Sequence, residues 1–497
     1  GKGNTMNKIK KISVLLLAFV MVFVMNANVF AAESGHTYET YKIFSGTQAE
    51  GSQALADVKW GDGVDEATIL DALKADDTIG TALAKCDTAA DVATAMKDWT
   101  DGSDEAKAFA RVAYANKKTG VAYSSTTDLD PGYYLVVDTT DVAGKDDVKN
   151  LALLQLTQKG SFDIAQKADK PSLIKKVKDI NDSTETALTE WQDSADHDFG
   201  DEIPFLLKAT LPTKLAEYKT YKLVFHDTGC AGLAVKEDSF VVYVGATELD
   251  EDDYTVDVDG NNFTVSIADV KALGGTAGGT VTVEYIATLT TSANIGSAGN
   301  PNVAYLEYSN DANYVGDGTN EPTGKTPEDK VIVFTYKAVV NKVDQDKNAL
   351  KGAGFTLYKY DKDTEKYVSV GSEVKGADLT TFEWKGIDDG QYKLVETTIP
   401  NGYNKMADQE FTVTASHDID SADPKLTDLS GDALTGSVIT FTKDVTAGTI
   451  TSTVENKAGT TLPETGGMGT TVIYLAGGFM VLAAAVLMIT RKRMTER

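Results

Sequence analysis

The sequence contains very little cysteine, histidine or proline. Only Cys86 and Cys230 occur among 497 residues, and they lie far apart, which excludes the disulfide framework that many small secreted proteins use. The four histidines show no metal-ligand spacing, and local motifs assemble no Ser-His-Asp or Cys-His arrangement. We therefore expect no metal, no cofactor and no enzyme active site. With only ten prolines and no Ser/Pro stalk, the domains are expected to stack directly.

Positive charge is scarce as well. Lysine and arginine number 47 against 74 aspartates and glutamates, which gives a net charge of −27. This balance excludes a nucleic-acid partner, because binding to phosphates requires clustered positive charge. It favours a soluble, exposed surface. The chain is also too long for one hydrophobic core, so we expect two to four domains.

The N-terminal region has the pattern of a secretory signal peptide. Three lysines precede an uncharged apolar run from Ile12 to Met25, and small residues end at Ala31. This order of basic, apolar and small residues predicts cleavage after Ala31. Residues 1–31 are thus a signal peptide, with an extension before its natural start at Met6.

The C-terminal region carries a second targeting pattern. The motif Leu462-Pro463-Glu464-Thr465-Gly466 precedes an uncharged apolar run from Val472 to Thr490 and the basic residues Arg491 to Arg493. The run has about the length that crosses a bilayer core, and the basic residues fit a cytoplasmic stop. Residues 462–497 resemble the cell-wall sorting signal of Gram-positive surface proteins. The resemblance implies that sortase cuts between Thr465 and Gly466 and transfers the threonyl acyl group to an amine at the cell surface.

Residues 32–168 have a mixed pattern that predicts an α+β domain. Helical spacing occurs in Glu66–Lys74 and Thr88–Ala115, and the strand candidates are Tyr38–Phe44 and Tyr133–Asp138.

Period-two alternation dominates the rest of the extracellular region. Residues 169–326 contain a hairpin signal at Asp259–Asn262 between two alternating segments, which is typical of a β-sandwich. A linker is expected at Glu321–Pro327, and residues 327–459 are again all β. The predicted fold is mainly β, with tandem immunoglobulin-like sandwiches after an α+β domain.

Several segments resemble families of pilus subunits. Residues 327–459 are similar to a Cna B-type domain, on the segments Val339–Asp344, Leu350–Leu357, Tyr392–Tyr403 and Val454–Lys457. Residues 169–326 resemble the fimbrial isopeptide-forming D2 domain, on Lys170–Val177, Val224–Asp227 and Asn302–Asn310. The first domain resembles pilin N-domains at Thr40–Gly46 and Pro131–Asp138. Together these resemblances imply a backbone subunit of a sortase-polymerised pilus.

In this family a lysine and an asparagine inside one domain join as an amide, ammonia leaves, and a carboxyl group catalyses the step. Burial favours this chemistry, because it lowers the pKa of the amine and raises that of the carboxyl. In the third domain the resemblance assigns Lys342 as nucleophile, Asn456 as acceptor and Glu396 as catalyst. The alternation of Val340, Lys342 and Asp344 only partly favours an inward lysine.

In the second domain the corresponding residues are Lys175, Asn310 and Asp227. Leu173, Lys175 and Val177 share one strand face, which predicts an inward Lys175. Lys176, on the other face, is the alternative nucleophile. Glu284 is the alternative carboxylate.

Polymerisation also requires an acceptor lysine, which the family often places in a Tyr-Pro-Lys motif. Here Ala165 and Gln166 precede Lys167, so the motif is altered. Lys167 is the predicted acceptor, with Lys159 and Lys170 as alternatives.

The expected function is that of a structural pilus subunit, not an enzyme. The alternative is a minor or tip pilin, or a wall-anchored adhesin with a host-surface ligand. Expected partners are sortase, other pilin subunits and peptidoglycan.

Overall fold

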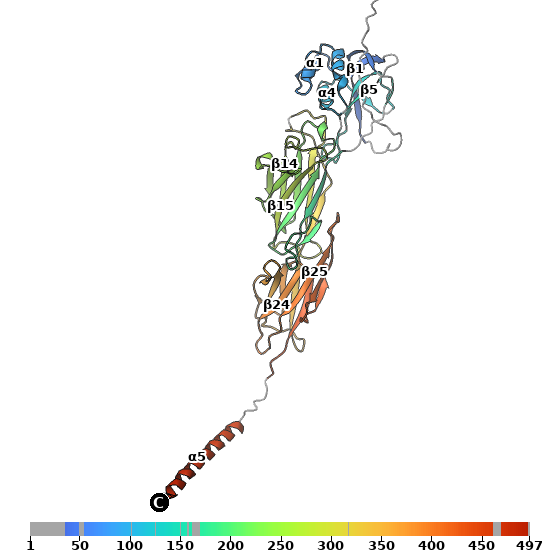
Figure 1. Ribbon diagram of the computed structural model, residues 1–497. Helices are drawn as coiled ribbons and strands as arrows, with labels where there is room; N and C mark the ends of the chain where they lie inside the picture. Colours follow the sequence, from blue (N-terminus) through green and yellow to red (C-terminus); the bar gives the residue numbers. More distant parts are fainter. Residues whose placement is uncertain are drawn as a thin grey trace, which may run out of the picture.

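The computed structural model describes residues 35–48, 54–100, 102–124, 126–149, 151–156, 159–161, 169–316, 318–460 and 469–495. Three units stack end to end into an elongated body, and a C-terminal helix follows (Figure 1). We call them the first unit (residues 35–161), the second unit (169–334) and the third unit (336–460). The signal peptide 1–31 and the sorting motif 462–466 lie outside the described residues.

The first unit is a β-sheet covered by short helices. Its strands run in the order β2-β1-β4-β5, with β3 beside β1. The strands are β1 (Tyr38–Gln48), β2 (Leu55–Trp60), β3 (Val121–Tyr123), β4 (Gly132–Asp138) and β5 (Leu151–Leu156). The helices are α1 (Ile69–Ala75), α2 (Gly80–Leu83), α3 (Ala89–Ala95) and α4 (Asp104–Ala115). Side chains such as Val92, Phe109 and Leu135 bury the helices against the sheet, as the α+β pattern predicted.

The single helical segment expected over Thr88–Ala115 divides into two helices. Thr88 and Asp91 form a reciprocal capping box that starts α3. Gly102 then takes a positive φ of 74°, a conformation that favours glycine and does not continue a helix. Ser103 caps the start of α4. The apolar spacing is continuous across the break, so the cap and the glycine decide the boundary.

The second unit is a sandwich of two sheets. One has the order β12-β11-β15-β8-β6 with β10 beside β15, and the other β13-β14-β9-β16-β18-β7 with β17 beside β16. The first sheet contains β6 (Ser172–Val177), β8 (Glu202–Thr210), β10 (Leu233–Val235), β11 (Val241–Val244), β12 (Thr247–Glu248) and β15 (Thr280–Leu289). The second contains β7 (Ser194–Asp196), β9 (Leu223–Gly229), β13 (Thr255–Asp259), β14 (Asn262–Ile267), β16 (Asn300–Ser309), β17 (Thr323–Lys325) and β18 (Asp329–Phe334).

The third unit is a second sandwich. Its sheets have the orders β23-β19-β28-β27 and β21-β20-β24-β25-β26, with β22 beside β20. The strands are β19 (Tyr336–Asp344), β20 (Gly354–Asp361), β21 (Lys366–Ser369), β22 (Val374–Lys375), β23 (Thr381–Ile387), β24 (Gly390–Thr398), β25 (Gln409–His417), β26 (Leu426–Ala433), β27 (Phe441–Asp444) and β28 (Thr449–Asn456). The prediction of tandem sandwiches after an α+β domain is confirmed.

The second and third units join within one continuous extended segment. Strand β18 pairs with β16 of the second unit, and the chain enters β19 of the third directly after Thr335. Val331 and Val333 pack in the core of the second unit, whereas Ile332 and Phe334 pack in that of the third. The linker expected at Glu321–Pro327 is therefore no linker, since β17 within it pairs with β16. Successive side chains of a strand point to opposite faces, so β18 packs into both cores and joins the two units without a linker.

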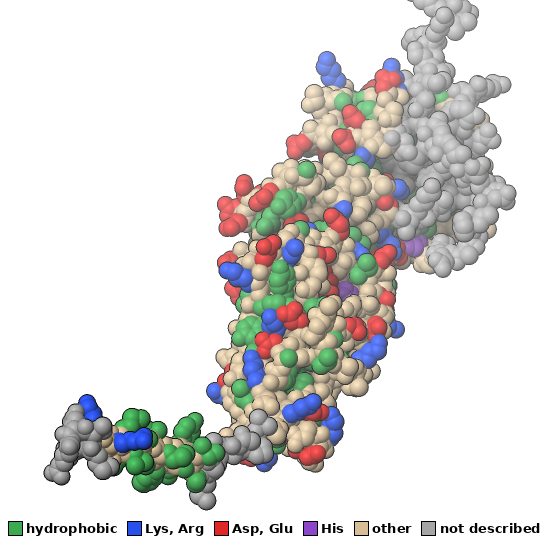
Figure 2. All heavy atoms as spheres, turned by 60° about the horizontal axis from the view of Figure 1, so that its bottom comes forward, with side chains coloured by type: hydrophobic (Ala, Val, Ile, Leu, Met, Phe, Trp, Pro, Cys, Tyr) green, Lys and Arg blue, Asp and Glu red, His purple; other side chains and the backbone are tan. Residues whose placement is uncertain are grey.

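The C-terminal helix α5 (Gly469–Thr495) contains a candidate membrane span from Val472 to Lys492 with a mean hydropathy of 2.5. Figure 2 shows its hydrophobic surface, with basic side chains near the far end. Its length and apolar composition suit a bilayer crossing.

Candidate functional site

A buried cluster in the third unit joins its first and last strands. Lys342 lies on β19, Asn456 ends β28, and these two strands run parallel as neighbours. Glu396 comes from β24 on the facing sheet. All three residues are about 1% exposed, so the structure brings together the trio predicted from the sequence.

The three side chains of the cluster contact one another. The Nζ of Lys342 lies 2.5 Å from the Oδ1 of Asn456 and 3.8 Å from the Oε1 of Glu396. The Nδ2 of Asn456 donates to that same Oε1 over 2.7 Å. The backbone N–H of Met406 donates to the other oxygen, Oε2, over 2.9 Å. One carboxyl oxygen therefore faces both the lysine nitrogen and the asparagine nitrogen.

Burial also prepares the Lys342 amine for attack. Loss of water lowers the pKa of Lys342 to about 8, although Glu396 partly opposes the change. The ring of Phe355 lies 5.8 Å from Nζ, so the amine is enclosed by apolar groups on that side. A pKa near 8 leaves a substantial neutral fraction at ordinary pH, and only the neutral amine is a nucleophile.

The second unit holds a related cluster between its two sheets. Lys175 on β6 is fully buried, and its Nζ donates to the carboxylate of Asp227 on β9. It also donates to the Oη of Tyr285 on β15 over 2.9 Å. Burial lowers the pKa of Lys175 and raises that of Asp227, while their mutual attraction opposes both changes. The pairing of Lys175 with Asp227 thus follows the sequence prediction.

The alternatives for this cluster lie elsewhere. Lys176 points to the other face of β6 and its Nζ donates to Asp193 over 2.5 Å. Glu284 alternates with the buried Val283 and Tyr285, so it faces away from the core. Lys175 and Asp227 are therefore favoured over both alternatives.

The predicted acceptor Asn310 does not reach this cluster. Its Nδ2 instead donates to the backbone oxygens of Val142 at 2.7 Å and Asp147 at 3.1 Å, which belong to the first unit. The asparagine at the cluster is Asn302, whose Nδ2 donates to the Oη of Tyr285 over 2.7 Å. At ~3.3 Å per residue, roughly 26 Å of strand separates the two asparagines.

Asn302 could have been found from the strand pattern. It alternates inward on β16 with Ala304 and Leu306, and Ala304 pairs with Asp227 on β9. Both asparagines are buried, so burial alone does not distinguish them. What separates them is their position along the sandwich, which depends on the register of β16 against β9.

The predicted polymerisation residues are only partly visible. Lys167 and the motif Leu462–Gly466 lie outside the described residues. Lys159 is exposed and lies 4.0 Å from Asp130. Lys170 is half-buried and its Nζ is held by Asp146 at 2.6 Å. Of the two described alternatives, Lys159 is the more accessible amine.

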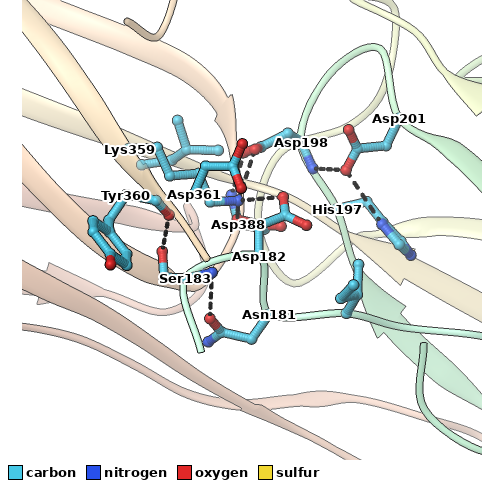
Figure 3. Close-up of polar contacts among 12 residues, drawn as sticks. Asn181, Asp182, Ser183, His197, Asp198, Asp201, Lys359, Tyr360, Asp361 and Asp388 are labelled. Carbon is cyan, nitrogen blue, oxygen red and sulfur yellow. Dashed lines mark hydrogen bonds and ion pairs between the residues drawn. The ribbon is translucent and has the colours of Figure 1, made fainter. Parts of the chain in front are cut away.

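A charged cluster that the sequence did not indicate lies where the second and third units meet (Figure 3). The Nζ of Lys359 on β20 contacts Asp388 of its own unit, and Asp198 at 2.8 Å and Asp182 at 3.1 Å from the second unit. Burial lowers the pKa of Lys359, but the three carboxylates outweigh this effect and raise it. Lys359 therefore stays an ammonium ion and serves as an ionic tie.

A histidine forms a second tie at the same junction. His417 on β25 lies 3.5 Å from Asp179 and 3.6 Å from Asp196 of the second unit. The Oγ of Ser194 lies 2.7 Å from its Nδ1. Burial alone would lower the pKa of His417, but the two carboxylates raise it to about 10. The residues of both ties are distant in sequence, so no local motif could reveal them.

Two segments of the chain match known protein families. Residues 337–428 match SpaA, a prealbumin-like fold domain, and residues 454–496 match the LPXTG cell wall anchor motif. The anchor motif and helix α5 place the protein at the cell surface, attached to the cell wall, with a membrane-anchored precursor. The fold and these segments define a wall-anchored surface protein with pilin-type modules.

Among individual proteins, the chain is 31% identical over 144 residues to the trypsin-resistant surface T6 protein of Streptococcus pyogenes serotype M6. That match covers 27% of this chain and about a quarter of the relative's length. The T6 backbone pilin structure, described as modular with three domains, matches with a TM-score of 0.52 and 17% identity, over 86% of this chain and 97% of that one. The major pilin SpaD of Corynebacterium diphtheriae gives 18% identity and a TM-score of 0.44, over 86% of this chain and 93% of that one. The match to the T6 structure shows that the two chains share an overall fold.

Proposed function

We propose that this protein is a structural subunit of a covalent surface pilus. Sortase joins Thr465 of one subunit to a lysine of the next and finally links the polymer to peptidoglycan. The observation that carries the proposal is the buried Lys342–Glu396–Asn456 cluster, in a chain that ends in a cell wall anchor. A lysine, an asparagine and a carboxyl group buried together suit internal amide formation.

The proposed reaction in the third unit needs no cofactor. The neutral Nζ of Lys342 attacks the Cγ of Asn456, and a carbon–nitrogen bond forms. Glu396 takes the proton that Nζ loses and passes it to Nδ2, which lies 2.7 Å away. The Cγ–Nδ2 bond breaks and ammonia leaves. In the second unit we assign the same roles to Lys175, Asp227 and Asn302, with Asn302 in place of Asn310.

Such a bond suits a fibre under tension. It would close a loop of 114 residues between the first and last strands of the third unit. By analogy with a disulfide, closing a loop of this size contributes about 5 kcal/mol to the free energy of unfolding. A load that enters at β19 would pass to β28 through a covalent link, so the sandwich would not unravel.

The acceptor for polymerisation remains Lys167 in this proposal. The side chain of Lys170 is engaged with Asp146. Lys159 is exposed and is the second choice among these lysines. Substituting Lys167 with alanine should abolish the ladder of covalent multimers. If the ladder persists in K167A but is lost in K159A, the acceptor is Lys159.

Intact mass and tryptic mapping of residues 32–461 test the internal bonds. Each amide releases one ammonia, about 17 Da. We expect the loss of two, with linked peptides that contain Lys342–Asn456 and Lys175–Asn302. An unmodified mass would refute the internal bonds and leave a wall-anchored β protein.

A minor or tip pilin, or an adhesin, is the second candidate. The replacement of the Tyr-Pro-Lys motif by Ala165, Gln166 and Lys167 favours it. A subunit at the tip or base would not form a homopolymer, so incubation with sortase would yield no ladder from this chain alone.

A further inference from the structure

A tyrosine hydroxyl lies at the centre of the cluster in the second unit. The Oη of Tyr285 lies 2.9 Å from the Nζ of Lys175, 3.0 Å from the Oδ2 of Asp227 and 2.7 Å from the Nδ2 of Asn302. The lysine and the asparagine donate to it, and it donates to the carboxylate. This uses the one donor and two acceptor positions of a phenol hydroxyl.

The ring of Tyr285 is fixed by its packing. It stacks on Phe205, with ring centres 5.2 Å apart and planes 12° apart, and meets the edge of Phe263 at 4.7 Å. The residue is 1% exposed, and burial raises the pKa of its hydroxyl well above the ordinary value, so it stays a neutral phenol. The hydroxyl is therefore held in place as a neutral phenol that donates to Asp227.

The two clusters differ in how the carboxyl group reaches the leaving nitrogen. In the third unit, Glu396 accepts directly from the Nδ2 of Asn456 over 2.7 Å. In the second unit the carboxyl belongs to aspartate, which is one methylene shorter. Asn302 also interacts with the Asp227 carboxyl, but the hydrogen bond of its Nδ2, at 2.7 Å, is to the hydroxyl of Tyr285, which in turn donates to Asp227 over 3.0 Å.

We propose that Tyr285 is a further catalytic residue of the second unit, which relays a proton between Asp227 and the leaving nitrogen of Asn302. The proposal depends on amide formation between Lys175 and Asn302. As the neutral Nζ bonds to Cγ, it loses a proton to Asp227. The protonated Asp227 then donates to the Oη of Tyr285, and the hydroxyl hydrogen turns toward Nδ2. The hydroxyl gives this hydrogen to Nδ2 as a proton and takes the proton of Asp227 in its place. The Cγ–Nδ2 bond then breaks, ammonia leaves, and both Tyr285 and Asp227 return to their starting states.

The test is a time course of bond formation in the full chain, with wild type and Y285F compared. Tryptic mapping quantifies the Lys175–Asn302 peptide, and the Lys342–Asn456 peptide serves as an internal control. We expect Y285F to slow formation of the first peptide by tenfold or more and to leave the second unchanged. Y305F is the matched control, because Tyr305 stacks on His226 on the outer face of the same unit.

Replacement of Tyr285 with 3-fluorotyrosine separates proton transfer from packing. The fluorine makes the hydroxyl more acidic and leaves the ring nearly the same size. A relay predicts a changed rate and a changed pH profile for the Lys175–Asn302 bond alone. A wild-type rate in both Y285F and the fluorinated chain would overturn the proposal. A wild-type protein that forms only the Lys342–Asn456 bond would also overturn it, while the proposed function of the third unit would stand.

Discussion

At the scale of single residues, the same side chain has opposite chemistry in different surroundings. Lys342 and Lys175 are buried beside a single carboxyl group each, and burial lowers the pKa of both amines. Lys359 is also largely buried, but three carboxylates around it raise its pKa. The number of opposing charges therefore decides whether the pKa of a buried lysine falls or rises.

The catalytic role of Glu396 can be tested by the E396Q variant. Glutamine keeps the size of the side chain but cannot carry the proton between the two nitrogens. We expect this variant to retain the one ammonia that the third unit would otherwise release, and to lose about 5 kcal/mol of stability through the missing loop closure. Mass spectrometry and denaturant unfolding measure the two effects. E383Q, on the exposed face of β23, should behave as wild type.

Asn302 and Asn310 form a matched pair for the second unit. N302A removes the acceptor and should abolish the Lys175 cross-link. N310A should leave that cross-link intact, because Asn310 binds backbone oxygens of the first unit. It should instead weaken the contact between the first and second units, so that a protease cuts the chain near that contact faster. A cross-link lost in N310A and kept in N302A would restore the original sequence prediction.

At the scale of elements, strand pairing decides what each proposed bond connects. The bond in the third unit would link two parallel neighbours in one sheet, β19 and β28. The bond in the second unit would link β6 in one sheet to β16 in the other. The first would resist pulling of terminal strands, and the second would resist separation of the two sheets.

Single-molecule pulling on the third unit tests the first of these roles. In the wild type, residues between Lys342 and Asn456 should not extend. In K342A the released loop of 114 residues should add about 400 Å of chain length, at ~3.5 Å per residue. K337A, on the same strand but in contact with Glu383, is the control. An equal extension in wild type and K342A would contradict a covalent bond between Lys342 and Asn456.

At the scale of the whole molecule, the second and third units are joined both by packing and by ion pairs. Strand β18 contributes side chains to both cores, and the ties of Lys359 and His417 cross the same junction. Nonpolar packing and ionic ties therefore hold the units in one orientation. In a pilus, such a joint would transmit force along the axis without bending at each module.

The junction should depend on pH through His417. The pKa of His417 in the folded chain, about 10, is above its ordinary value of 6.5, because Asp179 and Asp196 face it. Its contribution to stability is therefore complete below pH 6.5 and disappears as the pH rises through about 10. Calorimetry between pH 6 and pH 10 should show a transition temperature that falls by several degrees.

The variant H417Q should lower that temperature at pH 6 and flatten the dependence on pH. H226Q is the control, since His226 contacts Glu307 and Tyr305 within the second unit. A wild-type pH dependence in H417Q would show that another group controls it, such as His197, whose pKa burial alone would lower but the hydrogen bond to Asp201 raises to about 8.

The sequence by itself determined the C-terminal cell wall anchor and the mainly β fold, and its resemblance to a Cna B-type domain indicated the residues of the cluster in the third unit. These features depend on local composition, on period-two alternation and on motifs within one strand, which act over short distances along the chain. The inward position of Lys175 also followed from its apolar neighbours on β6.

Only the tertiary structure decided which distant groups meet. Asn302 replaced Asn310 because the register of β16 against β9, and not the identity of the residue, places a side chain beside Asp227. Tyr285 lies in the cluster because its strand, β15, belongs to the sheet of β6, which faces the sheet of β9 and β16. Strand β18 fused two units, and Lys359 met aspartates from both of them. These contacts join residues that are far apart in the chain. They are selected by the free energy of packing whole sheets, and no local sequence pattern encodes that free energy.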